Sequence, residues 1–480
     1  MSTGRTTARA AVWAFLATAG SRLITMVGLG LLARLLAPRE FGLLAFALVY
    51  ITYAETIGDL GSGMALVYWP DRRDDAAQVT FVINTLAGIG WCIVTFAIAP
   101  WVADFFNAPN GVSIVRVIGF SFILKYLGNA HDALSQKDLR FRARFVPELS
   151  LAFVKAGVSI VLAYMGYGAW SLVWGHMAGV AMRTLLLWVV VPWRPRLGVP
   201  MDLVKPMLGY GRGIIVVNVL AAITHHADLA VVGRLLGTTA LGLYQMASKI
   251  PEMTVIVMLW VVSTVLFPAF SRMHAAGESL RTPYLTATRY ISAATLPASA
   301  GLYLLAKPVI LVFLGDQWLG AVPILQALTV FTATRALSTH AGDVLKATGR
   351  AKLLAQLAVV KVGLIVPGLL IGARWGAAGV AWGQTIAAGI GTIITLVAAS
   401  YFIRVRLSAM LMASMPSIVG TIVMAVPVVA WVHWSERHLP VLLQTLGGVA
   451  LGAAVFAAVL ALLDRDLVRS ARRHFLPRTA

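Results

Sequence analysis

The chain has 480 residues, of which 59% are hydrophobic and 12% are charged, and its mean hydropathy is +0.83. Soluble domains carry about 25% charged residues, so too little polar surface remains here to cover a water-soluble globule. The apolar residues form runs of about 20 or more, which is the length that crosses a bilayer as a helix, while the alternating segments of a membrane β-barrel are absent.

The hydropathy pattern predicts an all-α polytopic membrane protein with about 14 transmembrane helices. In chain order the predicted spans cover residues 10–36, 41–68, 78–103, 112–133, 145–166, 168–191, 206–232, 240–268, 283–305, 320–345, 352–372, 376–402, 408–432 and 440–463.

The net charge of +20 is concentrated on one side of the predicted membrane. Basic residues gather near 134–145, near 192–205 and in the tail after 463, whereas the loops of the opposite side hold few. This asymmetry predicts a multi-pass protein of the cell (inner) membrane with both termini in the cytoplasm. Topology and contact with anionic membrane lipids account for most of the charge, so we expect no nucleic-acid partner.

Cys92 is the only cysteine, so the chain has neither a disulfide framework nor a cysteine metal site. We expect no metal and no cofactor. The first apolar segment is long and contains Arg22, unlike the short apolar core of a cleavable signal peptide. The loops are short, and no inserted soluble domain is expected.

Two short motifs occur twice. Arg34-Leu35-Leu36 with Gly42-Leu43 recurs as Arg234-Leu235-Leu236 with Gly242-Leu243, and Gly168-Ala169 with Trp174-Gly175 recurs as Gly376-Ala377 with Trp382-Gly383. The offset of 200–208 residues covers six predicted helices, an even number, so both halves enter the membrane in the same direction. Arg34 and Arg234 are interpreted as turn or rim residues.

This repeat predicts two parallel six-helix lobes and an appendage. The predicted domains are an N-lobe over 1–191, a Pro-rich cytoplasmic linker over 192–205, a C-lobe over 206–402, and spans 13 and 14 with a basic tail over 403–480. Membrane proteins built from two such halves usually move a substrate along the seam between them.

Ionisable side chains inside the predicted spans are the candidates for function, because a charge at the bilayer centre costs about 2.5–3.5 kcal/mol on insertion scales. Spacing predicts several ion pairs, because residues three, four or seven apart share a helix face. These are Lys125 with Asp132, Glu148 with Lys155, and Lys249 with Glu252, where Pro251 is expected to break the helix. The two acids Glu55 and Asp59 are four residues apart and share a helix face. Arg183 and Arg289 lie toward span ends, where long side chains snorkel.

Arg22 and Arg212 each lie in the first helix of a lobe without an acid within one turn. We expect them to line a transport cavity, together with Lys125, Lys155, Lys249, Arg335 and Lys361. Such a cavity would bind an anionic substrate group, since the guanidinium fork suits phosphate oxygens.

Asp59 and Asp228, with Glu55 as a partner, are candidates for coupling transport to H⁺ or Na⁺. The alternative is that they merely neutralise nearby cations. The charges do not repeat at the 200-residue offset, because Arg22 corresponds to Ala222 and Asp59 to Leu259. The scaffold is therefore duplicated while the chemistry is asymmetric.

The stretch from Ala33 to Leu43 resembles the "ARLLGPxxFGL" signature of bacterial Wzx-type polysaccharide flippases. The stretches 132–141, 265–271 and 313–318 are similar to other patterns of that family, and the resemblance covers about residues 10–405. It is nearest to the colanic-acid and exopolysaccharide branch.

The resemblance implies the V-shaped fold of the MOP superfamily, with two extra C-terminal helices. It implies alternating access that moves an undecaprenyl-diphosphate-linked oligosaccharide to the outer leaflet, for exopolysaccharide, capsule or O-antigen assembly. The diphosphate would meet a cationic cavity, which Arg22 and Arg212 fit by position. Polymerase and export proteins of the same pathway would be partners.

Three alternatives stay open. An exporter of drugs or small molecules from the same superfamily would favour an acidic and aromatic cavity, whereas cations are in excess here. A polymerase or glycosyltransferase would need a large outer loop with catalytic groups, and we find no such loop, so we expect a non-enzyme. A non-transporting scaffold would not need so many intramembrane charges.

Overall fold

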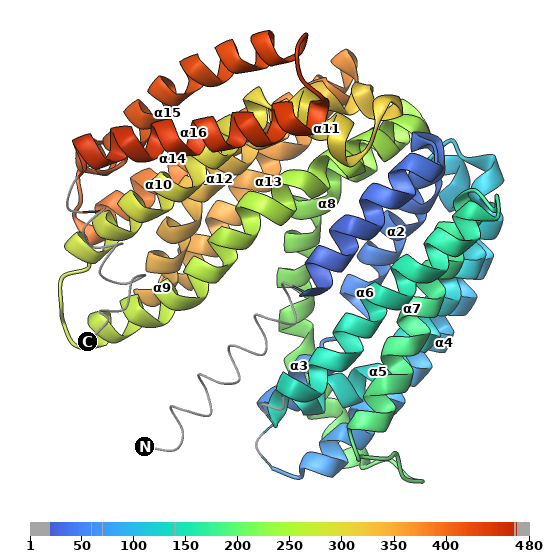
Figure 1. Ribbon diagram of the computed structural model, residues 1–480. Coiled ribbons are helices and arrows are strands. Elements are labelled where there is room, and N and C mark those ends of the chain that lie inside the picture. The colour runs from blue at the N-terminus through green and yellow to red at the C-terminus, as the bar shows by residue number, and fades with distance from the viewer. Residues whose placement is uncertain (1–19, 59, 70, 139–140, 465–466, 468–480) are drawn as a thin grey trace, which may run out of the picture. The chain divides into compact units, whose positions relative to one another are not determined.

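The computed structural model describes residues 20–58, 60–69, 71–138, 141–464 and 467. Every regular element within these residues is a helix (Figure 1). Among the described residues, ten helical stretches are long and apolar enough to cross a membrane, and the bent pair Arg281–Leu304 and Ala306–Phe313 would make an eleventh. The predicted all-helical class is confirmed at this level.

The chain folds as two compact units, residues 1–242 and residues 243–480, which we describe separately. Unit 1 begins with a helix over residues 20–35. It continues with α2 (Pro38–Gly58), α3 (Ser62–Tyr68), α4 (Arg73–Phe105), α5 (Val112–Lys137), α6 (Phe141–Tyr164), α7 (Ala169–Val190) and most of α8 (Met201–Pro251).

Neighbouring helices of unit 1 pack in pairs, α4 on α5 and α6 on α7, and α5 also packs on α7. Small residues allow close approach, as is usual between membrane helices. A Cβ on Gly28 of the first helix would lie 2.8 Å from the Cβ of Ala156 in α6. Residues 191–200 between α7 and α8 contain no helix.

The predicted uninterrupted span 41–68 is wrong. α2 ends at Gly58 and α3 starts at Ser62, because Leu60 (φ 51°) and Gly61 (φ 68°) both adopt the left-handed conformation. A left-handed residue cannot continue a right-handed helix, so the apolar run is divided into a long and a short helix.

The predicted separation of 206–232 from 240–268 agrees with a break inside α8, where Gly237 (φ 82°, ψ 179°) leaves the helical conformation between two helical segments. Pro251 does not break the helix completely, because a π-helical turn over Glu252–Ile256 joins α8 to the next helix, α9 (Val257–Ala275). Proline has no backbone N–H to donate, and a single π-helical turn changes the local hydrogen-bond pattern without ending the helix.

Unit 2 contains the helices that follow that turn. These are α9 (Val257–Ala275), α10 (Arg281–Leu304), α11 (Ala306–Phe313), α12 (Val322–Ala347), α13 (Ala351–Gly372), α14 (Gly376–Ile403), α15 (Leu407–Ser435) and α16 (Val441–Leu463). α10 and α11 meet at a bend of 76°. α14 packs on both α12 and α13, and α15 packs on α10 and α16.

Candidate functional site

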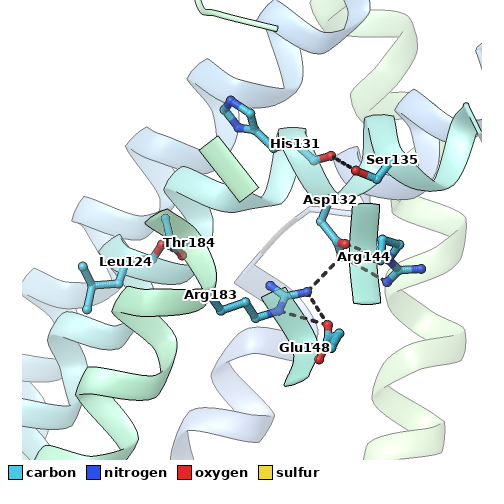
Figure 2. Close-up of polar contacts among 8 residues, drawn as sticks. All are labelled: Leu124, His131, Asp132, Ser135, Arg144, Glu148, Arg183 and Thr184. Carbon is cyan, nitrogen blue, oxygen red and sulfur yellow. Dashed lines mark hydrogen bonds and ion pairs between the residues drawn. The ribbon is translucent and has the colours of Figure 1, made fainter. Parts of the chain in front are cut away.

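Four charged side chains form one network in unit 1. The Asp132 carboxylate of α5 accepts from Arg144 Nε of α6 at 2.9 Å and lies 3.2 Å from Arg183 Nη2 of α7, which also reaches Glu148 Oε1 of α6 at 2.8 Å (Figure 2). Two cations and two acids balance one another, and the Arg183 side chain is only 15% exposed. The network therefore ties three helices together.

This network corrects three predictions. Arg183 does not snorkel, because it is buried between two carboxylates. Asp132 pairs with Arg144 and Arg183 instead of Lys125, and Glu148 pairs with Arg183 instead of Lys155. Residues seven apart do share a helix face, but the neighbouring helix supplies a closer partner than the same helix can.

Lys125, at the middle of α5, forms an ion pair with a different residue. Its Nζ lies 2.6 Å from Glu55 Oε2 of α2, across 70 residues of sequence. Lys155 on α6 lies against α7, since a Cβ on Gly179 would be 3.0 Å from the Lys155 Cβ. His176 of α7 is within electrostatic range of both lysines. Unit 1 thus gathers Lys125, Lys155 and His176, with Glu55 neutralising one lysine.

In unit 2 the predicted pair of Lys249 and Glu252 is confirmed, with 2.8 Å between Nζ and Oε2. Arg335 lies at the middle of α12 and Lys361 at the middle of α13, and both are half-buried. Neither forms an ion pair with any residue that the structure describes. Each cation at the bilayer centre costs about 2.5–3.5 kcal/mol unless it is compensated, so these two positions call for an anion or water.

Arg22 is half-buried in the first helix and forms no ion pair with the described residues. The side chain of Arg212 and the whole of Asp59 lie outside the described part of the structure. Asp228 of α8 is 8% exposed, accepts a hydrogen bond from the Leu229 amide at 2.8 Å, and is within electrostatic range of Tyr53 of α2.

Further ion pairs connect helix ends. Within unit 1, Arg72 contacts Asp75 and Asp202 beside the start of α8, and this guanidinium holds the pKa of the Asp202 carboxyl below its usual range. In unit 2, Lys307 contacts Glu436 and lowers the pKa of that carboxyl. Arg289 contacts the buried Asp464.

Sequence reasoning missed the part that Arg144 plays, because it counted Arg144 among the loop cations. The sequence did contain a signal: a basic residue, Arg144, lies at the start of one helix, and an acid, Asp132, lies near the end of the preceding helix. No group of three or more His, Cys, Asp or Glu side chains able to hold a metal occurs among the described residues.

Solved structures share this fold. The lipid II flippase MurJ in an inward closed conformation aligns with a TM-score of 0.79 over 95% of this chain and 100% of that chain, at 16% identity. An inward-facing multidrug resistance MATE family transporter of the MOP superfamily aligns with a TM-score of 0.65 over 82% of this chain and 98% of that chain, at 15% identity. The fold and its long apolar helices define a multi-pass membrane protein.

The chain belongs to the polysaccharide biosynthesis protein family, whose family model matches residues 31–323. The resemblance drawn from the sequence motifs is therefore confirmed. The lipopolysaccharide biosynthesis protein WzxC of Escherichia coli (strain K12) is 26% identical over 85% of this chain and 82% of its own length. The succinoglycan biosynthesis transport protein ExoT of Rhizobium meliloti (strain 1021) is 26% identical over 97% of this chain and 94% of its own length. ExoT is named as a transport protein and MurJ as a flippase, which are not names of enzymes.

Proposed function

We propose that this protein flips undecaprenyl-diphosphate-linked oligosaccharide repeat units across the cytoplasmic membrane by alternating access, for exopolysaccharide, capsule or O-antigen assembly. The observation that carries the proposal is the presence of basic side chains without acidic partners at the middle of α12 and α13, in a chain of this family. A diphosphate is the anion that a lipid-linked sugar brings into the membrane, and Arg and Lys both bind phosphate oxygens.

The relatives support the same substrate class. WzxC and ExoT are named for the biosynthesis of lipopolysaccharide and of succinoglycan, and MurJ is named as a lipid II flippase. We extend the proposal to 14 spans in two six-helix lobes, to the inner membrane with both termini cytoplasmic, and to polymerase and export proteins of the same pathway as partners. The distribution of basic residues supports that orientation.

The proposed substrate groups are Arg22, Arg212, Arg335 and Lys361, and Lys125, Lys155 and Lys249 remain further candidates. Asp228 is the described acid proposed for coupling to H⁺ or Na⁺, because it is largely buried inside unit 1. Arg22→Ala and Arg212→Ala are each expected to abolish polymer export without loss of protein level. Wild-type export from both variants would contradict this assignment.

Deletion of the gene tests the whole proposal. Surface polysaccharide should disappear, and lipid-linked repeat units should accumulate on the cytoplasmic face of the membrane, where an added impermeant glycosidase or lectin reaches them only in inverted vesicles. Repeat units that accumulate on the outer face instead would indicate a polymerase defect and overturn the proposal.

A further inference from the structure

The break between α2 and α3 places a short helix beside the start of α8. Leu60 adopts the left-handed conformation (φ 51°), which is strained for a bulky side chain, and strain of this kind clusters at functional sites. Beyond this turn, Ala65 and Leu66 of α3 are buried in one core cluster with Leu203 and Met207 of α8. The two helices therefore pack their apolar faces together within unit 1.

Polar contacts hold α3 at both of its ends. At its start, the Asn84 amide of α4 donates to Ser62 Oγ at 2.8 Å. At its end, the Lys137 ammonium group of α5 donates to the carbonyls of Leu66, at 3.1 Å, and of Trp69. A cation also matches the negative end of a helix dipole at this position. α3 is thus a fixed element, and side chains on such elements are suited to precise binding.

The exposed faces of the same two helices carry aromatic side chains. Met64 and Tyr68 are four residues apart on α3, so they share a face, and they are 51% and 63% exposed. Tyr210 of α8 stacks on Tyr68, with 4.6 Å between the ring centroids and 11° between the ring planes. Because the stack covers one face of the Tyr68 ring while this residue stays largely exposed, the other face of the ring is open.

Charged side chains flank this stack along the chain. Arg72, four residues after Tyr68, contacts Asp202, eight residues before Tyr210, and their side chains are 46% and 61% exposed. Charges as exposed as these belong in water and not among lipid tails. In the orientation proposed above, the basic residues place this end of unit 1 on the cytoplasmic side. A substrate that arrives from the cytoplasm would meet aromatic rings together with a guanidinium and a carboxylate.

We propose that Tyr68 and Tyr210 form a platform on which a sugar ring of the repeat unit stacks at the cytoplasmic side, while Arg72 and Asp202 hydrogen-bond sugar hydroxyl groups. The inference rests on the proposed function and concerns the sugar part of its substrate. The C–H bonds on one face of a sugar ring carry partial positive charge, and the face of an aromatic ring is negative, so the two attract one another. A tyrosine that only anchors the membrane interface would not need a parallel ring from a second helix.

Binding of the free repeat-unit oligosaccharide to the full-length protein in phosphatidylcholine nanodiscs tests the platform. Mild acid releases this probe from the lipid-linked units of the deletion strain, and saturation-transfer NMR measures its Kd. Tyr68→Ala and Tyr210→Ala should each raise the Kd about fivefold, which corresponds to one aromatic contact. Tyr68→Phe should bind like the wild type because it keeps the ring. The matched control Tyr164→Ala should also bind like the wild type, since it removes an exposed tyrosine at the last residue of α6.

An unchanged Kd in both alanine variants would overturn the platform, and so would an absence of binding by the wild type. Loss of binding in Tyr68→Phe would contradict stacking. Both alanine variants should melt at the wild-type temperature, and a loss of binding that comes only with a lowered melting temperature would mean that the rings merely pack α3 on α8.

Each of these results leaves the proposed function standing if the wild-type gene restores polymer export to the deletion strain. A deletion strain that accumulates no lipid-linked units would overturn the proposed function, and the platform with it.

Discussion

Gly42 and Gly242, which stand 200 residues apart in the repeated motif, pack backbone against backbone within residues 1–242. A Cβ on Gly42 would lie 1.7 Å from the carbonyl oxygen of Thr238, and a Cβ on Gly242 would lie 1.9 Å from that of Pro38. Pro38 and Thr238 are themselves 200 residues apart. The contact is therefore reciprocal, like an interface about a two-fold axis, and it explains why both copies of the motif contain glycine.

Gly42→Ala and Gly242→Ala should each destabilise the protein, because the added methyl group meets a backbone carbonyl that cannot turn away. Overpacking of this kind costs about 1–3 kcal/mol. Thermal unfolding in detergent measures it, with Gly90→Ala as the control, since a Cβ at this position in α4 meets no atom within 4 Å. A Gly242→Ala protein that melts at the wild-type temperature would show that the contact is looser than described.

The charge network around Arg183 makes a prediction about pairs of substitutions. Arg183→Leu leaves Glu148 without its partner and should cost about 3 kcal/mol, the lower end of the range for a broken buried pair, because Glu148 is partly exposed. The double variant Arg183→Leu/Glu148→Leu should recover much of that loss, since Asp132 keeps Arg144. The melting temperatures of the single and the double variant measure this recovery. Equal destabilisation of the two variants would contradict an ion-pair role for Arg183.

Glu55→Gln should create a second anion site. The substitution removes the acid that pairs with Lys125 in unit 1. Pyrophosphate titration by calorimetry should then give two sites per chain where the wild type gives one. A single site of unchanged affinity would mean that Lys125 and Lys155 cannot act together on one ligand.

The ion pair of Arg72 and Asp202 should make stability depend on pH in the acidic range. The pKa of Asp202 is lowered in the folded protein, so its contribution is present above the unfolded-state pKa of about 3.9 and is lost as the pH falls through the folded value. Asp202→Asn should therefore melt below the wild type at pH 7, and the difference should be smaller at pH 3. If the difference in melting temperature were the same at pH 7 and at pH 3, the Asp202 carboxyl would not be its source.

The sequence predicted those features that depend on local pattern. Apolar runs predicted the helices, and the spacing of Lys249 and Glu252, three residues apart, predicted their ion pair correctly. It failed at Leu60, whose left-handed backbone divides an apolar run that carries no proline there. Hydropathy alone contains no information about such a turn.

The partners of the buried charges could not be predicted from spacing, because they come from other helices. Lys125 pairs with Glu55 from α2, and Arg183 with acids of α5 and α6. The equivalence of Lys155 and Lys361 was visible in the sequence as a repeated Val-Lys-x-Gly, but only when the offset is allowed to vary with loop length.

Transfer of a lipid-linked oligosaccharide in proteoliposomes tests the central claim most directly. Purified protein is reconstituted with undecaprenyl-diphosphate-linked repeat units, and the sugar that becomes accessible to an impermeant lectin is followed over time. Wild-type protein should move the units between leaflets, Lys307→Gln should do the same, and Lys361→Gln should slow the transfer at least tenfold. Transfer by the wild type no faster than in protein-free liposomes would contradict the account.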